Sequence, residues 1–290
     1  MHQSKTAAFL NQKGGVGKTT SVVNVGAGLT ILGKKVLLVD LDPQGHLTSF
    51  LGIESSEVKK GIYEVLLWKS HPSEAIITRT MSARLYIDGR ESQLSLSVIP
   101  STPDLAEAER TLIDAVHQEF QLQTIIAELS DDFDYILFDC APGFGLISIN
   151  ALATSKKVFI PVQTEYLALK SLEDLIKKIE FYATELKLNI VVGGLIATRY
   201  DGRKVLCRSV VETLRGRFGA LLLETIIREN IALADSPRFG KDIFSYRPRS
   251  YGAEDYLNLS LEIMGRIATA SALFSVERGV IKSNADNVAV

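Results

Sequence analysis

One glycine-rich stretch constrains the fold more than any other part of this chain: the sequence KGGVGKTT at residues 13–20. It follows a short apolar segment over residues 6–10 and opens a helix-like run over residues 19–32. Glycines between a strand and a helix let the backbone curl, so that successive N–H groups point at phosphate oxygens. The positive end of the following helix adds to this attraction. The stretch therefore predicts a loop that binds the phosphates of a nucleotide.

The residue types of this loop indicate a division of roles. The ammonium of Lys18 would reach the β- and γ-phosphates, and the hydroxyl of Thr19 would ligate Mg²⁺. The other loop residues expected to contact the nucleotide are Lys13, Gly14, Gly15, Val16, Gly17 and Thr20. A glycine-rich turn without a ligand is the alternative, which Gly-Lys-Thr-Thr in this context disfavours.

Two apolar runs that follow the loop end in aspartates. The run KVLLVDL at residues 35–41 is nearly continuous and is broken by a proline and a glycine, so Asp40 and Asp42 lie at the carboxyl end of a predicted buried strand. The run YILFD at residues 135–139 ends in Asp139. Ligands of open α/β sheets bind at the carboxyl ends of the strands. We expect the carboxylate of Asp139 to approach Mg²⁺ through its water shell.

Predicted strands and helices alternate along most of the chain. Strands are expected at residues 5–10, 35–41, 96–99, 135–139, 158–162, 190–197 and 221–226. Helices are expected at residues 18–32, 47–51, 61–68, 72–78, 104–129, 167–186, 204–217 and 253–275, with a polar loop over residues 82–95. This alternation predicts an α/β fold with a mostly parallel sheet and helices on both faces. We expect one domain over residues 1–275 and a polar C-terminal tail over residues 276–290.

The composition is that of an ordinary globular protein, with 46% hydrophobic and 23% charged residues among 290. The net charge of −2 does not indicate a nucleic-acid-binding protein as a whole, so any such role requires a local basic patch. Two cysteines without a CxxC pair fit a reducing cytosol and give no zinc signature. We expect a cytoplasmic protein, because no apolar run is long enough for a signal peptide or a membrane span.

The motifs together resemble a known family. NQKGGVGKTT, VLLVDLDPQG and DYILFDCAPG look like the three nucleotide motifs of the ParA/Soj group, within the ParA/MinD superfamily of P-loop ATPases. The segment IPVQTEYLALKSL and the residues from Ile227 to Lys241 also resemble this group, and the likeness covers about residues 5–270. The pattern G-x-x-x-x-G-K-[ST] is not met, because Gln12 stands where its first glycine would fall. The second lysine, Lys13, instead looks like that of a deviant Walker A box.

The resemblance implies a mechanism. Lys13, Lys18 and Asp42 would act in catalysis, with Lys13 crossing a dimer interface to the nucleotide of the other subunit and Asp42 positioning the attacking water. Thr19, Asp40 and Asp139 would hold the Mg²⁺ shell, largely through water. Thr198 and Arg228, farther along the chain, would also contact ATP. ATP would close a sandwich homodimer that binds double-stranded DNA on the nucleoid without sequence preference. A ParB-like partner would stimulate the slow ATPase and release the dimer. No membrane partner is implied, because the tail has no basic amphipathic helix of the MinD kind.

A basic patch for DNA is predicted late in the chain. Residues 199–249 contain eleven basic and six acidic residues, a net charge of +5 within a chain of net charge −2. Lys204, Arg208 and Arg215 fall near one face of the predicted helix. The candidate DNA-binding residues are Arg203, Lys204, Arg208, Arg215, Arg217 and Arg247. An ordinary solvated helix face is the alternative interpretation.

Three functions remain open at this point. The first is an ATPase that partitions a chromosome or plasmid. The second is the same switch positioning a protein cargo over the nucleoid. The third is a metal- or redox-delivery ATPase of the same superfamily, which needs cysteines that bridge a metal between subunits. Cys140 ends a buried strand and Cys207 lies in a distant predicted helix, so the sequence disfavours the third function.

Overall fold

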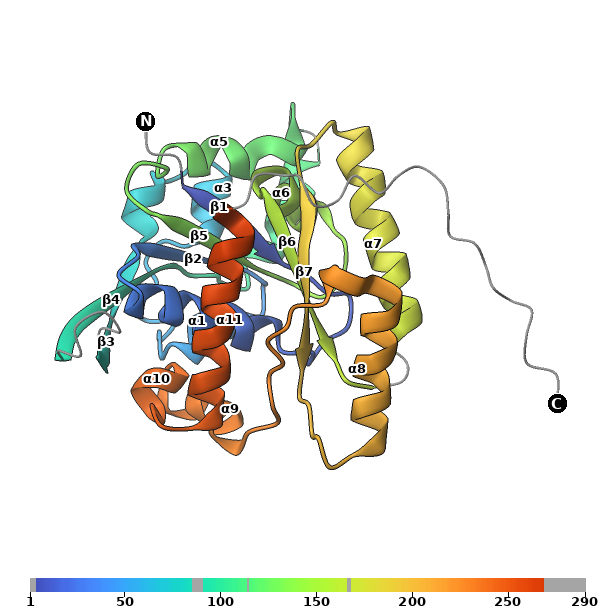
Figure 1. The fold of residues 1–290 in the computed structure, drawn as a ribbon. Coiled ribbons are helices and arrows are strands. Elements are labelled where there is room, and N and C mark those ends of the chain that lie inside the picture. The colour runs from blue at the N-terminus through green and yellow to red at the C-terminus, as the bar shows by residue number, and fades with distance from the viewer. Residues whose placement is uncertain (1–3, 85–90, 114, 166–167, 269–290) are drawn as a thin grey trace.

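A computed structural model describes residues 4–84, 91–113, 115–165 and 168–268 (Figure 1). Its strands form a single sheet in the order β3-β4-β2-β5-β1-β6-β7. Neighbouring strands are parallel except for the antiparallel pair β3 and β4, which confirms the predicted mostly parallel sheet. The strands are β1 (Lys5–Phe9), β2 (Val36–Leu41), β3 (Ile77–Arg84), β4 (Glu91–Ile99), β5 (Tyr135–Cys140), β6 (Lys157–Gln163) and β7 (Val191–Thr198).

Helices cover both faces of this sheet. The α-helices are α1 (Lys18–Ile31), α2 (His46–Phe50), α3 (Ile62–Leu66), α4 (Leu105–Leu112), α5 (Gln121–Ala127), α6 (Leu146–Thr154), α7 (Ala168–Glu185), α8 (Val205–Phe218), α9 (Ile231–Asp235), α10 (Ile243–Tyr246) and α11 (Tyr251–Ala268). Short 3₁₀ helices are η1 (Pro72–Ala75), η2 (Gln118–Phe120), η3 (Gly219–Leu221) and η4 (Ser236–Phe239). Figure 1 shows α11 (red) crossing one face of the sheet, where it packs beside α1.

The alternation of side chains along each strand explains why both faces are covered. Val36 and Leu38 of β2 belong to a buried cluster that α1, α10 and α11 cover. Leu37 and Val39 point the other way, into a second cluster covered by α3 to α8. Because successive strand residues face opposite sides, a strand that is apolar at every position must be buried on both faces. The chain therefore has the single-domain α/β fold that the sequence predicts.

The register of the central strands brings the sequence motifs to one edge of the sheet. Asp40 of β2 is the direct neighbour of Asp139 of β5. Asp139 in turn lies beside Phe9, the last residue of β1. The three strands are parallel, so their carboxyl ends lie together and the glycine-rich loop after β1 begins at the same edge.

Two expectations about residues 72–95 are wrong. The expected helix over residues 72–78 is the 3₁₀ helix η1 followed by β3, and the described parts of the expected polar loop over residues 82–95 belong to β3 and β4. Leu96 and Val98 of β4 are buried in the same cluster as Met81 of β3. The alternation of Leu and Val with Ser in SQLSLSVI was the available signal, because half-buried strands alternate apolar and polar residues.

Two other elements are interrupted. The expected helix over residues 104–129 is divided into α4, η2 and α5, and His117 between them has a φ of 55°. Helical periodicity did not reveal the break, because Leu105 and Leu122 pack into the same cluster. The expected strand over residues 221–226 pairs with β7 through one isolated bridge, between Leu222 and Leu195, and a second isolated bridge lies beyond both segments, between Arg228 and Tyr200.

The predicted tail over residues 276–290 and the end of the domain at residue 275 lie outside the described residues. The final helix α11 is described as far as Ala268. None of the helices in the described ranges is long and apolar enough to cross a membrane.

Candidate nucleotide-binding site

A cavity of about 870 Å³ opens at the carboxyl ends of the central strands. The glycine-rich loop forms its floor, and the segment from Ile227 to Arg238 forms a second wall. The predicted ATP-binding residues that line it are Gly14, Gly15, Gly17, Lys18, Thr19, Thr20, Thr198 and Arg228, and the predicted catalytic residue Asp42 joins them. The other two predicted ATP-binding residues, Lys13 and Val16, are not among the lining residues of the described chain. Val16 is buried.

The shape of the loop depends on glycine at two positions. Gly15 has a φ of 73° and Gly17 a φ of 90°, in the left-handed region that side chains disfavour. Two polar side chains anchor the same loop to the sheet. Asn11 accepts a hydrogen bond from the N–H of Lys13 at 3.0 Å, and the hydroxyl of Thr198 donates to the carbonyl of Val16 at 2.8 Å. Thr198 thus ties the predicted phosphate-binding loop to the end of β7.

Lys18 begins α1 at the floor of the cavity and is buried. Its ammonium donates to the carbonyl of Lys13 at 3.4 Å. Burial lowers the pKa of Lys18, and the negative charges of Asp139 and Asp42 partly offset this effect. A polyphosphate in the cavity would favour the charged form of this lysine, because an opposite charge nearby compensates for reduced solvation.

Thr19 and Asp139 form the part of the site that fits a divalent cation. The hydroxyl of Thr19 donates to Oδ2 of Asp139 at 2.7 Å, across the contact between α1 and β5. The other oxygen, Oδ1, is buried and has no hydrogen-bond partner among the residues that the structure describes. Burial and the adjacent charge of Asp40 raise the pKa of Asp139 well above its usual value. A buried carboxylate oxygen beside a threonine hydroxyl is a suitable donor set for Mg²⁺ or for its water shell.

The two aspartates after β2 occupy different environments. Asp42 lines the cavity, accepts a hydrogen bond from the N–H of Gln44 at 2.9 Å and lies 3.7 Å from Nδ1 of His46. Asp40 is fully buried and is not among the lining residues of the described chain. Burial raises the pKa of Asp40 to about 6. Both oxygens of Asp40 accept hydrogen bonds from the protein itself, which favours a role other than the expected one in the metal shell.

Lys13 lies at the rim of the cavity, where its side chain is 44% exposed. Its ammonium is 2.7 Å from the carboxylate of Glu165, a residue just after β6. The second lysine of the motif therefore does not point to the cavity that its own loop builds. Sequence reasoning did not identify Glu165 as its partner.

Arg228 lines the cavity, but its guanidinium is held by α11. It pairs with Asp255 and Glu254 and lies 4.3 Å from the centre of the Tyr251 ring. These contacts raise the pKa of Arg228 further above its usual value. Contact with a nucleotide through this guanidinium would require exchange of these partners.

Sequence reasoning missed several lining residues. His46, Ser49 and Phe50 come from α2, and Tyr256 comes from α11, where its hydroxyl is 3.2 Å from that of Ser21. Other lining residues belong to the segment that contains α9 and η4: Asn230, Ile231, Leu233, Ala234, Pro237 and Arg238. The contribution of α11 left no local signal, because it depends on packing between helices that are distant in the sequence.

Most of the cations predicted to contact DNA are already paired. The ion pairs are Arg203 with Asp201 at 2.9 Å, Lys204 with Glu229 at 3.2 Å, Arg215 with Glu224 at 3.1 Å and Arg217 with Glu173 at 3.0 Å. Arg208 donates to the carbonyl of Gly202. Arg247 differs from these residues, because no ion pair involves it within the described part of the chain. Its guanidinium lies 5.7 Å from the centre of the Tyr246 ring.

Known proteins resemble this chain over most of its length. The family described as an AAA domain matches residues 4–192. The chain is 40% identical over 259 residues to the sporulation initiation inhibitor protein Soj of Bacillus subtilis. This alignment covers 89% of this chain and 98% of that protein. The chain is also 39% identical over 256 residues to the chromosome partitioning protein ParA of Myxococcus xanthus, in an alignment that covers 88% of this chain and 86% of that protein.

A solved structure adds a likeness in three dimensions. Cobyrinic acid a,c-diamide synthase from Mycobacterium smegmatis, with bound ADP and magnesium, is 31% identical and has a TM-score of 0.73. The alignment covers 89% of this chain and 92% of that one. The motifs, the fold and these relatives agree. The chain therefore belongs to the ParA/Soj group of the ParA/MinD superfamily of P-loop ATPases.

Proposed function

We propose that this protein is a partitioning ATPase that works as a nucleotide-dependent switch. ATP binding with Mg²⁺ closes a homodimer, the dimer binds double-stranded DNA without sequence preference, and a ParB-like partner stimulates hydrolysis and release. The names of the relatives Soj and ParA support the partitioning role. The observation that carries the proposal is the location of Lys13 at the rim, outside the cavity that already contains Lys18.

The cavity supplies the groups that hydrolysis needs. Lys18 and the loop N–H groups would stabilise the charge on the transferred phosphate. Thr19 and Asp139 would hold Mg²⁺, which when bound would supply charge neutralisation. The carboxylate of Asp42 faces the same cavity and orients the attacking water. Positioning and charge stabilisation account for most of the catalysis in phosphoryl transfer, so no further nucleophile is required.

The rim of the cavity suits a dimer interface. Ile231 lines the cavity and is 81% exposed. Val205 and Leu206, at the start of α8, are 70% and 52% exposed and follow Lys204, which pairs with the lining residue Glu229. Large exposed apolar side chains near charged groups favour association with another protein surface. A second copy would place its own nucleotide within reach of Lys13, which would add charge-assisted contacts to the apolar ones.

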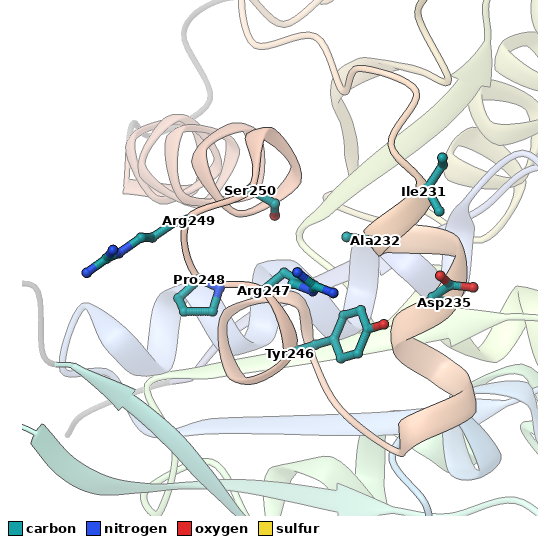
Figure 2. Close-up of a pocket in the computed structure, with 8 residues that line it drawn as sticks. All are labelled: Ile231, Ala232, Asp235, Tyr246, Arg247, Pro248, Arg249 and Ser250. Atoms are coloured by element: carbon teal, nitrogen blue, oxygen red, sulfur yellow. The ribbon is translucent and has the colours of Figure 1, made fainter.

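We propose a groove between α9 and the loop after α10 as the surface that binds DNA phosphates. This groove has a volume of about 530 Å³ and is lined by Ile231, Ala232, Asp235, Tyr246, Arg247, Pro248, Arg249 and Ser250 (Figure 2). Arg247 and Arg249 have no ion-pair partner among the residues that the structure describes. In Figure 2 Arg249 extends away from the groove. These unpaired cations release counterions on binding phosphates without first giving up a carboxylate partner.

The cysteines do not support a metal-delivery function. Cys140 and Cys207 are both buried. Burial also raises the pKa of the Cys140 thiol, which disfavours the thiolate that binds metals.

Co-sedimentation with random-sequence DNA tests the proposal. Retention should be strong with a non-hydrolysable ATP analogue and weak with ADP. Equal retention in the two states would contradict a nucleotide-dependent switch.

A further inference from the structure

The carboxylate of Asp40 is fully engaged by the chain around it. Oδ1 accepts a hydrogen bond from the N–H of Asp42 at 3.2 Å. Oδ2 accepts two, from the N–H of Thr48 at 2.9 Å and from its hydroxyl at 2.7 Å. Asp40 is completely buried, and Thr48 is 5% exposed. Buried carboxylates that accept several N–H and O–H bonds hold the donating backbone in place, because breaking one bond leaves a charge unsatisfied.

The two ends of one loop meet at this carboxylate. Asp42 leaves β2 at the start of the loop, and Thr48 belongs to α2 at its end. Within the loop, the N–H of Gly45 donates to the carbonyl of Asp42 at 2.8 Å, and Gly45 has a φ of 61°. The N–H of Gln44 holds the Asp42 side chain itself at 2.9 Å. Hydrogen bonds thus fix both ends of the loop, and the carboxylate of Asp42 faces the cavity.

The hydroxyl of Thr48 also connects this loop to the neighbouring strand. It accepts a hydrogen bond from the N–H of Ser101 at 3.0 Å while it donates to Asp40. Ser101 follows β4, which is paired with β2. Only a group that donates and accepts at once can satisfy both partners, and a hydroxyl does so. The loop is therefore fixed relative to two adjacent strands of the sheet.

We infer that Asp40 and Thr48 are positioning residues that hold the carboxylate of Asp42 in its catalytic place. Asp40 then acts on catalysis through the loop, rather than as a ligand to the metal shell. The inference rests on the role proposed above for Asp42. A displacement of about 1 Å in a group that orients a reactant can reduce turnover about 100-fold. Removal of the hydrogen bond between the Thr48 hydroxyl and Asp40 should therefore lower kcat.

The test compares steady-state kinetics of Thr48→Val and Thr48→Ser. Valine keeps the shape of threonine and removes the hydroxyl, so we expect kcat to fall about 10- to 100-fold while KM for ATP stays within about threefold. Serine keeps the hydroxyl and should restore turnover. If the valine variant fails to fold, Thr48→Ala answers the same question, since it also lacks the hydroxyl and adds no bulk.

Thr30→Val is the matched control. Thr30 is also a buried threonine, and its hydroxyl donates to the carbonyl of Gly26 at 2.9 Å within α1, away from the cavity. A general effect of burying valine in place of threonine would appear there as well, and we expect full turnover for this control. Unchanged kcat in Thr48→Val and Thr48→Ala, a change confined to KM, or failure of serine to restore turnover would each overturn the inference.

One further variant separates this inference from the proposed function. Asp42→Ala in the same assay should be inactive. An active Asp42→Ala would contradict the role proposed for Asp42 itself. An inactive Asp42→Ala together with a fully active Thr48→Val would contradict only the positioning role of Thr48 and Asp40.

Discussion

The ammonium of Lys13 lies 2.7 Å from the carboxylate of Glu165, outside the cavity that contains Lys18. Both side chains are nearly half exposed, at 44% and 49%. Exposed ion pairs contribute little to stability, because water solvates both charges well. The exchange of Glu165 for the phosphates of a second subunit, which we propose for Lys13, would therefore cost little. Under this proposal Lys13 would make an intermolecular contact while Lys18 would bind the nucleotide of its own subunit.

Lys18→Ala should abolish ATP binding. No other ammonium lines the cavity among the described residues, so the β- and γ-phosphates would be without their main cationic partner. Calorimetric titration of the variant with ATP and Mg²⁺ measures this. Affinity close to that of the parent protein would show that the glycine-rich loop is not the nucleotide site.

Asp42→Ala should bind ATP and dimerise but stop hydrolysing. A carboxylate that orients water acts on the transition state more than on the bound ground state, so kcat should fall by about 100-fold or more. Phosphate release should be followed with and without the stimulating partner. Turnover at the parental rate would remove Asp42 from the mechanism.

The double variant Arg247→Ala/Arg249→Ala should weaken DNA binding in the ATP state. Each arginine that no longer binds a phosphate should reduce the slope of log affinity against log salt by about one. The matched double variant is Arg208→Ala/Arg215→Ala on α8, whose side chains already have partners. Its DNA affinity should fall less in the same titration. A larger decrease in the α8 variant would locate the DNA surface on that helix instead.

Gly28→Ala should destabilise the fold. A Cβ at this position would meet the side chain of Ser260 on α11, with the Ser260 Cβ at 2.9 Å. Overpacking of this kind typically costs about 1–3 kcal/mol. Gly216→Ala on α8 is the control, because no described atom beyond its chain neighbours and its own helix backbone lies within 4 Å of a Cβ added there. This control should be neutral or stabilising by about 0.5–1 kcal/mol. Urea unfolding of both variants measures the difference, and equal stabilities would refute the close packing of α1 on α11.

The nucleotide loop and the central strands could be predicted because their signals are local. Gly15 and Gly17 of the loop adopt positive φ, and strands buried on both faces are apolar at every position. The hairpin of β3 and β4 was missed although its alternation was present in the sequence. The division of the helix after Asp104 gave no such signal, because α4 and α5 pack on one cluster.

The positions of the candidate site residues could be predicted from the sequence better than their hydrogen-bond and ion-pair partners. Thr19, Asp139 and Asp42 meet at one edge as expected, because parallel strands align their carboxyl ends. The sequence could not show that Asp40 closes a loop with Thr48, since that contact depends on the turn between them. Nor could it show which arginines are paired, since the pairing of Arg217 with Glu173 spans α8 and α7.

The most direct test of the switch is sedimentation of Lys13→Ala with a non-hydrolysable ATP analogue. The variant should still bind the analogue, because Lys18 and the loop N–H groups remain. It should stay monomeric where the parent protein dimerises, since it lacks the ammonium that reaches the second nucleotide. A normal ATP-dependent dimer of Lys13→Ala would contradict the proposed switch, because the contact between subunits would then not depend on Lys13.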